Sequence, residues 1–151
     1  MYVVVRVRGT ANVRGDVEDT LARLGLEKPN HCVIIPETPD YQGMLQKAKD
    51  FIAYGSIDHE TLSSLLRKRG RITGGKRLDE VNVKELGFKT VEEFAEALLE
   101  GKVRMKDFPN VKPVFRLRPP SRGYGSVKKY YPEGAIGNWG TEVNILIKKM
   151  V

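Results

Sequence analysis

The densest group of side chains that could do chemistry lies between residues 67 and 77. Glycines interrupt this run at three positions, and they let the main chain approach a phosphate closely and present its amide hydrogens. The alternative is that the cations only stabilise the C-terminal end of a helix through the helix dipole. This would explain the first three basic residues but not the later ones. The segment therefore predicts a polyanion-binding surface. Its basic residues are Arg67, Lys68, Arg69, Arg71, Lys76 and Arg77.

A second basic segment follows between residues 116 and 139, and aromatic residues are interleaved with it. The basic residues are Arg116, Arg118, Arg122, Lys128 and Lys129, and the aromatic ones are Tyr124, Tyr130, Tyr131 and Trp139. Unpaired RNA exposes base faces on which aromatic rings and guanidinium planes stack, so the pattern suits single-stranded or irregular RNA. Tyr124 is the expected stacking residue. The alternative is a loop whose aromatic rings cover a sheet edge, and for Trp139 both interpretations stand.

Signals for catalysis or for a metal are missing from the sequence. It contains neither G-x-G-x-x-G after a strand nor G-x-x-x-x-G-K-[ST], so no nucleotide pocket is predicted. His59 follows a probable helix cap, and His31 with Cys32 has no orienting third group. One cysteine and two histidines cannot build a disulfide or a structural zinc site. We expect no catalytic residue, no metal and no cofactor.

Length and charge bound the class of protein. The 151 residues suffice for a single domain, and no stretch approaches the roughly 18 apolar residues of a membrane helix. The start of the chain lacks the pattern of a secretory leader, so a cytoplasmic protein is expected. The net charge is +7, and its excess is concentrated: residues 59–77 and 113–151 each carry +5, whereas the other two blocks carry −1 and −2. This distribution favours a polyanionic partner.

Hydrophobic periodicity predicts alternating strands and helices in the first half of the chain. Residues 2–8 alternate like a strand, with Arg6 and Arg8 on the open face. We expect helices over 14–24 and 59–69, a strand over 31–35 with Cys32 in the core, and a short strand over 55–57. A further helix is expected to begin at Thr38, with an apolar stripe that reaches Ile52.

In the second half we expect a helical insert over 78–101, a short strand over 113–118, a loop over 119–140 and a closing strand over 141–150. The fold class is α+β, a small ferredoxin-like sheet with helices packed on one face and the opposite face free, plus the helical insert and the C-terminal extension. The expected parts of this single domain are a core (1–58), a basic helix with loop and insert (59–112), and a basic extension (113–151).

Several of these segments carry a resemblance to a known family. In order and spacing, Tyr2 to Gly9, Leu21 to Leu26, His31 to Ile35 and Thr38 to Leu45 resemble the large-subunit ribosomal protein family called L-thirty in bacteria and L-seven in eukaryotes. Leu65 to Gly70 and Pro113 to Gly123 look like the extension of its archaeal and eukaryotic members. The long basic N-terminal helix of eukaryotic members has no counterpart here. The chain thus resembles the archaeal long form.

The resemblance implies a structural constituent of the large ribosomal subunit, one that binds and stabilises 23S-type rRNA during assembly and translation in the cytoplasm. It implies no small-molecule substrate and no membrane, and it leaves contacts with neighbouring ribosomal proteins open. The RNA-facing positions that it implies are Arg6, Arg8, Arg14, Gln42, Lys47, Arg67, Lys68, Arg69, Arg118 and Arg122.

Two other functions remain as alternatives. Val7 to Gly15 resembles the arginine-bearing loop of acylphosphatase-like hydrolases, in which an arginine and loop amides hold phosphate. The asparagine that should follow the second strand is missing, since Pro36 to Thr38 stands there. A free-standing RNA-binding regulator would differ only in being found outside ribosomes.

Overall fold

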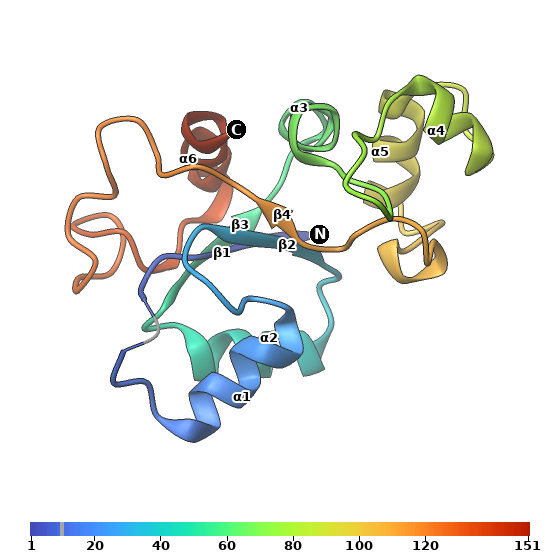
Figure 1. The fold of residues 1–151 in the computed structure, drawn as a ribbon. Helices are drawn as coiled ribbons and strands as arrows, with labels where there is room; N and C mark the ends of the chain where they lie inside the picture. The colour runs from blue at the N-terminus through green and yellow to red at the C-terminus, as the bar shows by residue number, and fades with distance from the viewer. Residues whose placement is uncertain (10) are drawn as a thin grey trace.

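The computed structural model describes residues 1–9 and 11–151, in which a five-stranded sheet lies between two layers of helices (Figure 1). The sheet order is β4-β2-β1-β3-β5, and β1 runs antiparallel to both β2 and β3. β2 and β3 are therefore parallel, with β1 inserted between them, which is the split βαβ arrangement of ferredoxin-like folds. The strands are β1 (Tyr2–Arg6), β2 (His31–Ile35), β3 (Ile52–Ser56), β4 (Phe115–Arg116) and β5 (Gly137–Asn138).

Helices α1 (Gly15–Leu24) and α2 (Pro39–Ala48) cover one face of the sheet, the lower one in Figure 1. α1 ends at Gly25, whose left-handed φ of 85° a glycine adopts without strain. α2 begins at Thr38, whose hydroxyl accepts a hydrogen bond from the amide of Tyr41. Leu21 and Leu45 pack with Val4 and other residues of this face into one apolar cluster. The expected α+β class, with these two helices on one face, is confirmed.

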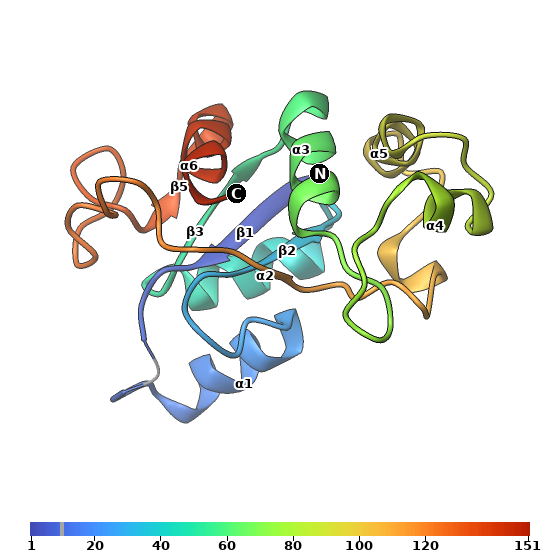
Figure 2. The same ribbon diagram turned by 45° about the horizontal axis from the view of Figure 1, so that its top comes forward.

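The opposite face is not free, contrary to expectation. Helices α3 (His59–Arg69) and α6 (Val143–Met150) lie on it, as Figure 2 also shows. Val3, Val5 and Ala53 of the sheet share a buried cluster with Leu65 and Ile147 of these helices. Since this cluster removes both the sheet face and the two helical stripes from water, α3 and α6 belong to the main core.

The prediction of a closing strand over 141–150 is wrong, because α6 occupies this segment. Its buried residues Val143, Leu146, Ile147 and Met150 follow the i, i+3, i+4, i+7 spacing of a helix. Ile145, which strand alternation would have buried, is 52% exposed. A strand that buried Val143, Ile145 and Ile147 would expose Leu146 and Met150. Both are buried, so they distinguish the helix from a strand.

The junction between β3 and α6 is tightly packed. A Cβ atom on Gly55 would overlap the carbonyl oxygen of Gly140 and the side chain of Val143, so only glycine fits there. Asn144 fixes the same junction, since its Nδ2 donates to the Ser56 carbonyl at 3.1 Å and its Oδ1 accepts the Asp58 amide at 3.0 Å.

The expected helical insert is confirmed and consists of α4 (Glu80–Glu85) and α5 (Val91–Leu99), followed by a 3-10 turn (Met105–Asp107). α5 packs along α3. Phe88, Phe94 and Phe108 form a small aromatic cluster under the insert, with ring centroids 5.2–6.2 Å apart. Phe94 belongs to the same buried cluster as Val3 and Leu65, and Phe88 and Phe108 pack against that cluster, so the insert extends the main core along α3.

Several boundaries differ from the sequence prediction. The second helix ends at Ala48, and Ile52 begins β3 because it pairs with Arg6 in the sheet. The strand expected over 113–118 contains only Phe115 and Arg116, which pair with β2. The expected loop contains β5, which pairs in parallel with β3 and forms an edge of the sheet.

Candidate nucleic-acid interface

The C-terminus of α3 continues into a tight turn that carries the first basic segment. The turn is closed by the amide of Ile72, which donates to the Lys76 carbonyl at 2.9 Å. Gly74 and Gly75 both have positive φ angles, of 96° and 79°, which this turn requires. Lys76 and Arg77 are exposed on it, and Lys68 is exposed in the last turn of α3.

Four arginines from two distant parts of the sequence converge at this turn. Arg69 is half-buried, and its pKa is lowered by that burial first, and then by the charges of Arg118, Arg71 and Arg77. Arg71 is held in place, since its guanidinium donates to the carbonyls of Gly70 and Lys68 at 2.9 and 3.3 Å. We call Arg69, Arg71, Arg77 and Arg118 the arginine cluster. Like charges near enough to lower the pKa of Arg69 favour the approach of a polyanion.

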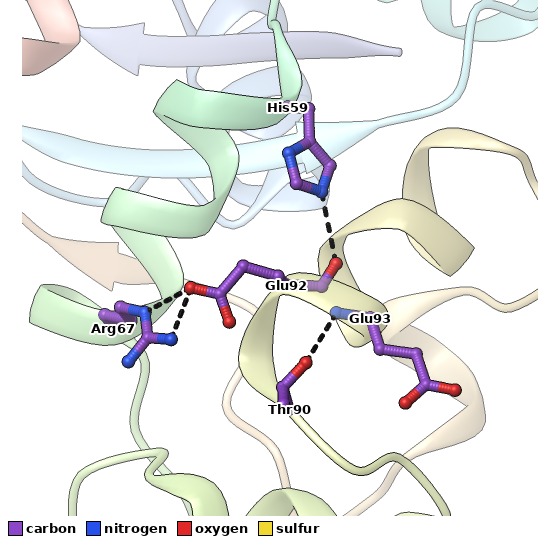
Figure 3. Close-up of polar contacts among 5 residues, drawn as sticks. All are labelled: His59, Arg67, Thr90, Glu92 and Glu93. Carbon is purple, nitrogen blue, oxygen red and sulfur yellow. Dashed lines mark hydrogen bonds and ion pairs between the residues drawn. The ribbon is translucent and has the colours of Figure 1, made fainter.

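Arg67, at the same helix end, is already paired within the protein. Its guanidinium donates from Nε and Nη2 to Oε1 of Glu92 on α5, the Nε bond measuring 2.9 Å (Figure 3). The hydrogen bond from Arg67 is the main reason why the pKa of Glu92 is lowered. Sequence reasoning missed this pair, which joins residues 25 positions apart.

Figure 3 shows that the pair belongs to a wider contact between α3 and α5. His59 Nε2 lies 3.2 Å from the carbonyl oxygen of Glu92, and the Thr90 hydroxyl caps α5 by accepting the Glu93 amide at 3.2 Å. His59 therefore sits at a helix contact, and Arg67 helps to position the insert.

Arg6 was expected to face RNA, and its position corrects that expectation. The side chain is only 1% exposed. Its guanidinium donates to the carbonyls of Leu26, Arg8 and Gly9 at 2.7, 3.0 and 3.2 Å. Burial lowers its pKa, and the charge of Glu18 partly offsets this effect. Arg6 is thus a structural residue that fastens the loop after β1, because all three acceptors lie outside the strands.

The other two candidates near β1, Arg8 and Arg14, each contact a neighbouring side chain of the protein. Arg8 is half-buried, with its guanidinium carbon 4.8 Å from the ring centroid of Phe51, so its expected place on an open sheet face is also wrong. Arg14 is exposed and pairs with Asp16 at 3.3 Å. Thr10 of this loop lies outside the described residues.

The aromatic residues of the loop over 119–140 are placed differently from one another. The ring of Tyr124 packs against the core and its hydroxyl donates to Asn30, so the expected stacking residue has little free ring face. Burial raises its pKa. Tyr131 and Trp139 stack on each other with centroids 4.5 Å apart, which supports the sheet-edge interpretation of Trp139. Tyr130 is exposed and its hydroxyl donates to Asp50.

The remaining basic candidates of this half are on the surface. Arg116 lies on β4 opposite His31, and its charge, after burial, contributes to the lowered pKa of His31. The exposed side chains are those of Arg116, Arg118, Arg122, Lys128 and Lys129.

Gln42 and Lys47 are exposed on α2, which lies on the other face of the sheet from α3. Gln42 lines a hollow of about 400 Å³ between α2 and the sheet. Sequence reasoning missed the other residues of this hollow, although a second glutamine one helical turn after Gln42 was a signal for it.

The described residues form neither a metal site nor a membrane-spanning helix. Within residues 1–9 and 11–151, no group of three or more potential metal ligands comes together. Among the helices of the same residues, none is long and apolar enough to span a membrane. Cys32 is buried as expected, and burial raises its pKa.

Comparisons with known proteins agree with the resemblance seen in the sequence. The family model "Ribosomal protein L30p/L7e" matches residues 2–52. Proteins named large ribosomal subunit protein uL30 match over 99% of both chains. They are 52% identical in Archaeoglobus fulgidus, 53% in Methanocorpusculum labreanum and 51% in Methanococcus vannielii.

The match extends through the insert and the C-terminal extension, which the family model does not cover. These relatives are archaeal ribosomal proteins and not enzymes, which confirms the expectation that the chain is no enzyme and removes the acylphosphatase-like alternative. On this full-length similarity, the chain belongs to the uL30 family of large ribosomal subunit proteins.

Proposed function

We propose that the protein is a structural constituent of the large ribosomal subunit that binds and stabilises 23S-type rRNA in the cytoplasm. The observation that carries this proposal is a sequence identity of 52–53% with proteins named uL30, over 99% of both chains. A protein that worked by a different mechanism would not need to preserve the insert, the extension and their spacing together.

The arginine cluster supports the RNA-binding part of the proposal. Phosphates need positive groups that can spread along a backbone, and this cluster gathers them from α3, the following turn and the segment after β4. The exposed candidates Lys68, Lys76 and Arg122 extend it. Arg6 is withdrawn from the proposed contacts because its donors are used inside the protein.

Sedimentation distinguishes a ribosomal constituent from a free-standing RNA-binding regulator. A lysate is run through a sucrose gradient, the ribosomal fractions are washed at raised salt, and mass spectrometry locates the chain. We expect stoichiometric migration with the large subunit. A chain that stays at the top of the gradient contradicts the proposal and leaves the regulator.

Binding to purified 23S-type rRNA tests the contact itself. Several phosphate contacts predict that the affinity falls steeply between about 50 and 200 mM salt, with a slope of roughly −0.7 to −0.9 per contact on logarithmic axes. A shallow slope would show that the cations do not face the RNA.

A further inference from the structure

The hollow under α2 differs from the basic surfaces in having no charged residue in its wall. It lies between α2 and the edge of the sheet formed by β1, β3 and β5, and its volume of about 400 Å³ falls within the range of small-ligand sites. Its lining residues are Tyr2, Pro39, Gln42, Gly43, Leu45, Gln46, Tyr54 and Asn138. In a chain with a net charge of +7, an uncharged polar hollow indicates a ligand part that is itself uncharged.

The floor of the hollow comes from three strands. Tyr54 of β3 stands beside Asn138 of β5 in the parallel register, and Val4 of β1 pairs with Tyr54 on the other side. The rings of Tyr2 and Tyr54 meet edge to face, with centroids 6.1 Å apart. Burial first, and then the neighbouring Tyr2, raise the pKa of Tyr54.

The wall is one stripe of α2. Pro39, Gln42, Gly43 and Gln46 follow the i, i+3, i+4, i+7 spacing, so they share a face of the helix. Leu45 borders the same hollow and is buried in the core beneath it.

The polar groups of the hollow are largely unused by the protein. Within the described part of the chain, the side-chain amides of Gln42 and Gln46 and the hydroxyls of Tyr2 and Tyr54 make no hydrogen bond. Asn138 uses its Oδ1 to accept the Gly140 amide at 2.8 Å, which leaves its Nδ2 donor. Donors and acceptors thus line one concave surface, and because Gln42 and Gln46 are exposed, their amides are open to a partner from outside the chain.

Gly43 is a second and independent observation. It stands inside a ten-residue helix, where glycine destabilises relative to alanine, and it needs no positive φ. A Cβ atom there would meet nothing within 4 Å, so packing inside this chain does not demand glycine. The fold does not require glycine at this position in the wall of the hollow. A glycine here would instead allow another molecule to approach the helix backbone closely.

We propose that this hollow receives one unpaired nucleobase of the bound RNA. The inference rests on the proposed function and adds that this face reads a base, while the arginine cluster holds phosphates. Amide side chains present a donor and an acceptor side by side, which matches the edge of a base, and the tyrosine rings supply an aromatic boundary. A phosphate would instead require cations in the wall.

The test uses the full chain and a transcript of 23S-type rRNA, with the single variants Gln42→Ala and Gln46→Ala. Base edges are probed with dimethyl sulfate for A and C and with a carbodiimide for G and U. We expect the wild type to protect an unpaired base that both variants leave reactive. We also expect an affinity loss of about 5- to 100-fold with an unchanged salt slope, since no ion pair is removed. Val81→Ala, an exposed neutral change on α4, is the matched control.

Gly43→Ala separates a binding role from a folding role. It should raise the melting temperature by about 2–4 °C, because alanine favours the helix, and yet weaken RNA binding. Gly43→Leu, which fills more of the hollow, should weaken binding further without unfolding the protein. Tighter or equal binding by both variants overturns the inference.

The outcomes separate the two proposals. If the wild type protects rRNA but the glutamine variants change no base and bind as well, the base site is wrong and the proposed function stands. A weaker affinity that comes with a shallower salt slope also overturns the base site, since the glutamines would then be supporting phosphate binding. If the wild type protects no rRNA at all, the proposed function fails and the base site fails with it.

Discussion

Arg6 and Arg69 are both arginines drawn away from water, and yet the charges around them differ in sign. Burial is the first cause of a lowered pKa at both. Around Arg6, three carbonyls accept its hydrogen bonds and Glu18 favours its charge. Around Arg69, the charges of three other arginines lower its pKa further. Neighbouring acceptors therefore decide whether an arginine holds its own chain together or is available to an anionic partner.

The largest effect should follow from removing Arg6. Arg6→Ala leaves three carbonyls of the chain without their donor, and we expect the free energy of unfolding to fall by about 2–4 kcal/mol. Urea denaturation measures it. The salt slope of rRNA binding by the folded fraction should stay as in the wild type. A stable variant with a reduced slope would reverse the roles assigned to Arg6.

Next in size is the loss of two members of the arginine cluster. Arg69→Ala with Arg118→Ala should weaken rRNA binding by about 10- to 100-fold and reduce the salt slope by about 1.5, roughly 0.7 to 0.9 for each cation. Relief of repulsion should leave the protein as stable as before or slightly more so. Filter binding at several salt concentrations gives the slope. An unchanged slope would remove the cluster from the interface, and Arg23→Ala on α1 is a control that also removes an arginine.

A smaller effect is expected at the pair between α3 and α5. Both side chains of this pair are nearly half exposed, 44% for Arg67 and 45% for Glu92, so the coupling energy of a double-mutant cycle should be about 0.3–1 kcal/mol. Because Glu92 neutralises it, Arg67→Ala should also change the salt slope less than Lys68→Ala. Equal slopes for the two variants would show that RNA displaces Glu92 from Arg67.

The smallest effect is a pH dependence at His31. Its pKa is lowered by burial first and then by Arg116 and Lys28, so the unfolded chain binds the proton more readily than the folded one. The free energy of unfolding should therefore decrease as the pH falls below about 6.5, the ordinary value for histidine. Chemical denaturation at pH 7.5 and 5.5 should show a weaker decrease for His31→Gln than for the wild type. The same decrease in both would contradict the assignment, and His59→Gln serves as the comparison.

Local patterns predicted much of this fold because their signals lie within a few residues. The cap at Thr38, the end of α1 at Leu24 and both bounds of α3 are where the sequence predicted them. The final helix was missed because its alternating Val143, Ile145 and Ile147 also fit a strand, and only contact with the sheet decides which residues are buried.

The candidate site was less predictable, since it depends on contacts between distant segments. The sequence indicated both basic segments, but the approach of Arg118 to Arg69 depends on the path of the chain after β4. The burial of Arg6 depends on carbonyls that only the folded loops bring together. Glu92 likewise meets Arg67 across 25 residues.

The tight junction at Gly55 has a consequence for the order of events during synthesis. The first strand and the last helix share one buried cluster, from Val3 to Met150, and the amide of Ile57 bonds to the carbonyl of Met1. Until the residues of α6 have been synthesised and have emerged, this apolar face of β1 and β3 lacks α6 and is in contact with water. The N-terminal core can form its strands early, but it gains its full stability only when the final helix emerges and docks beside Gly55.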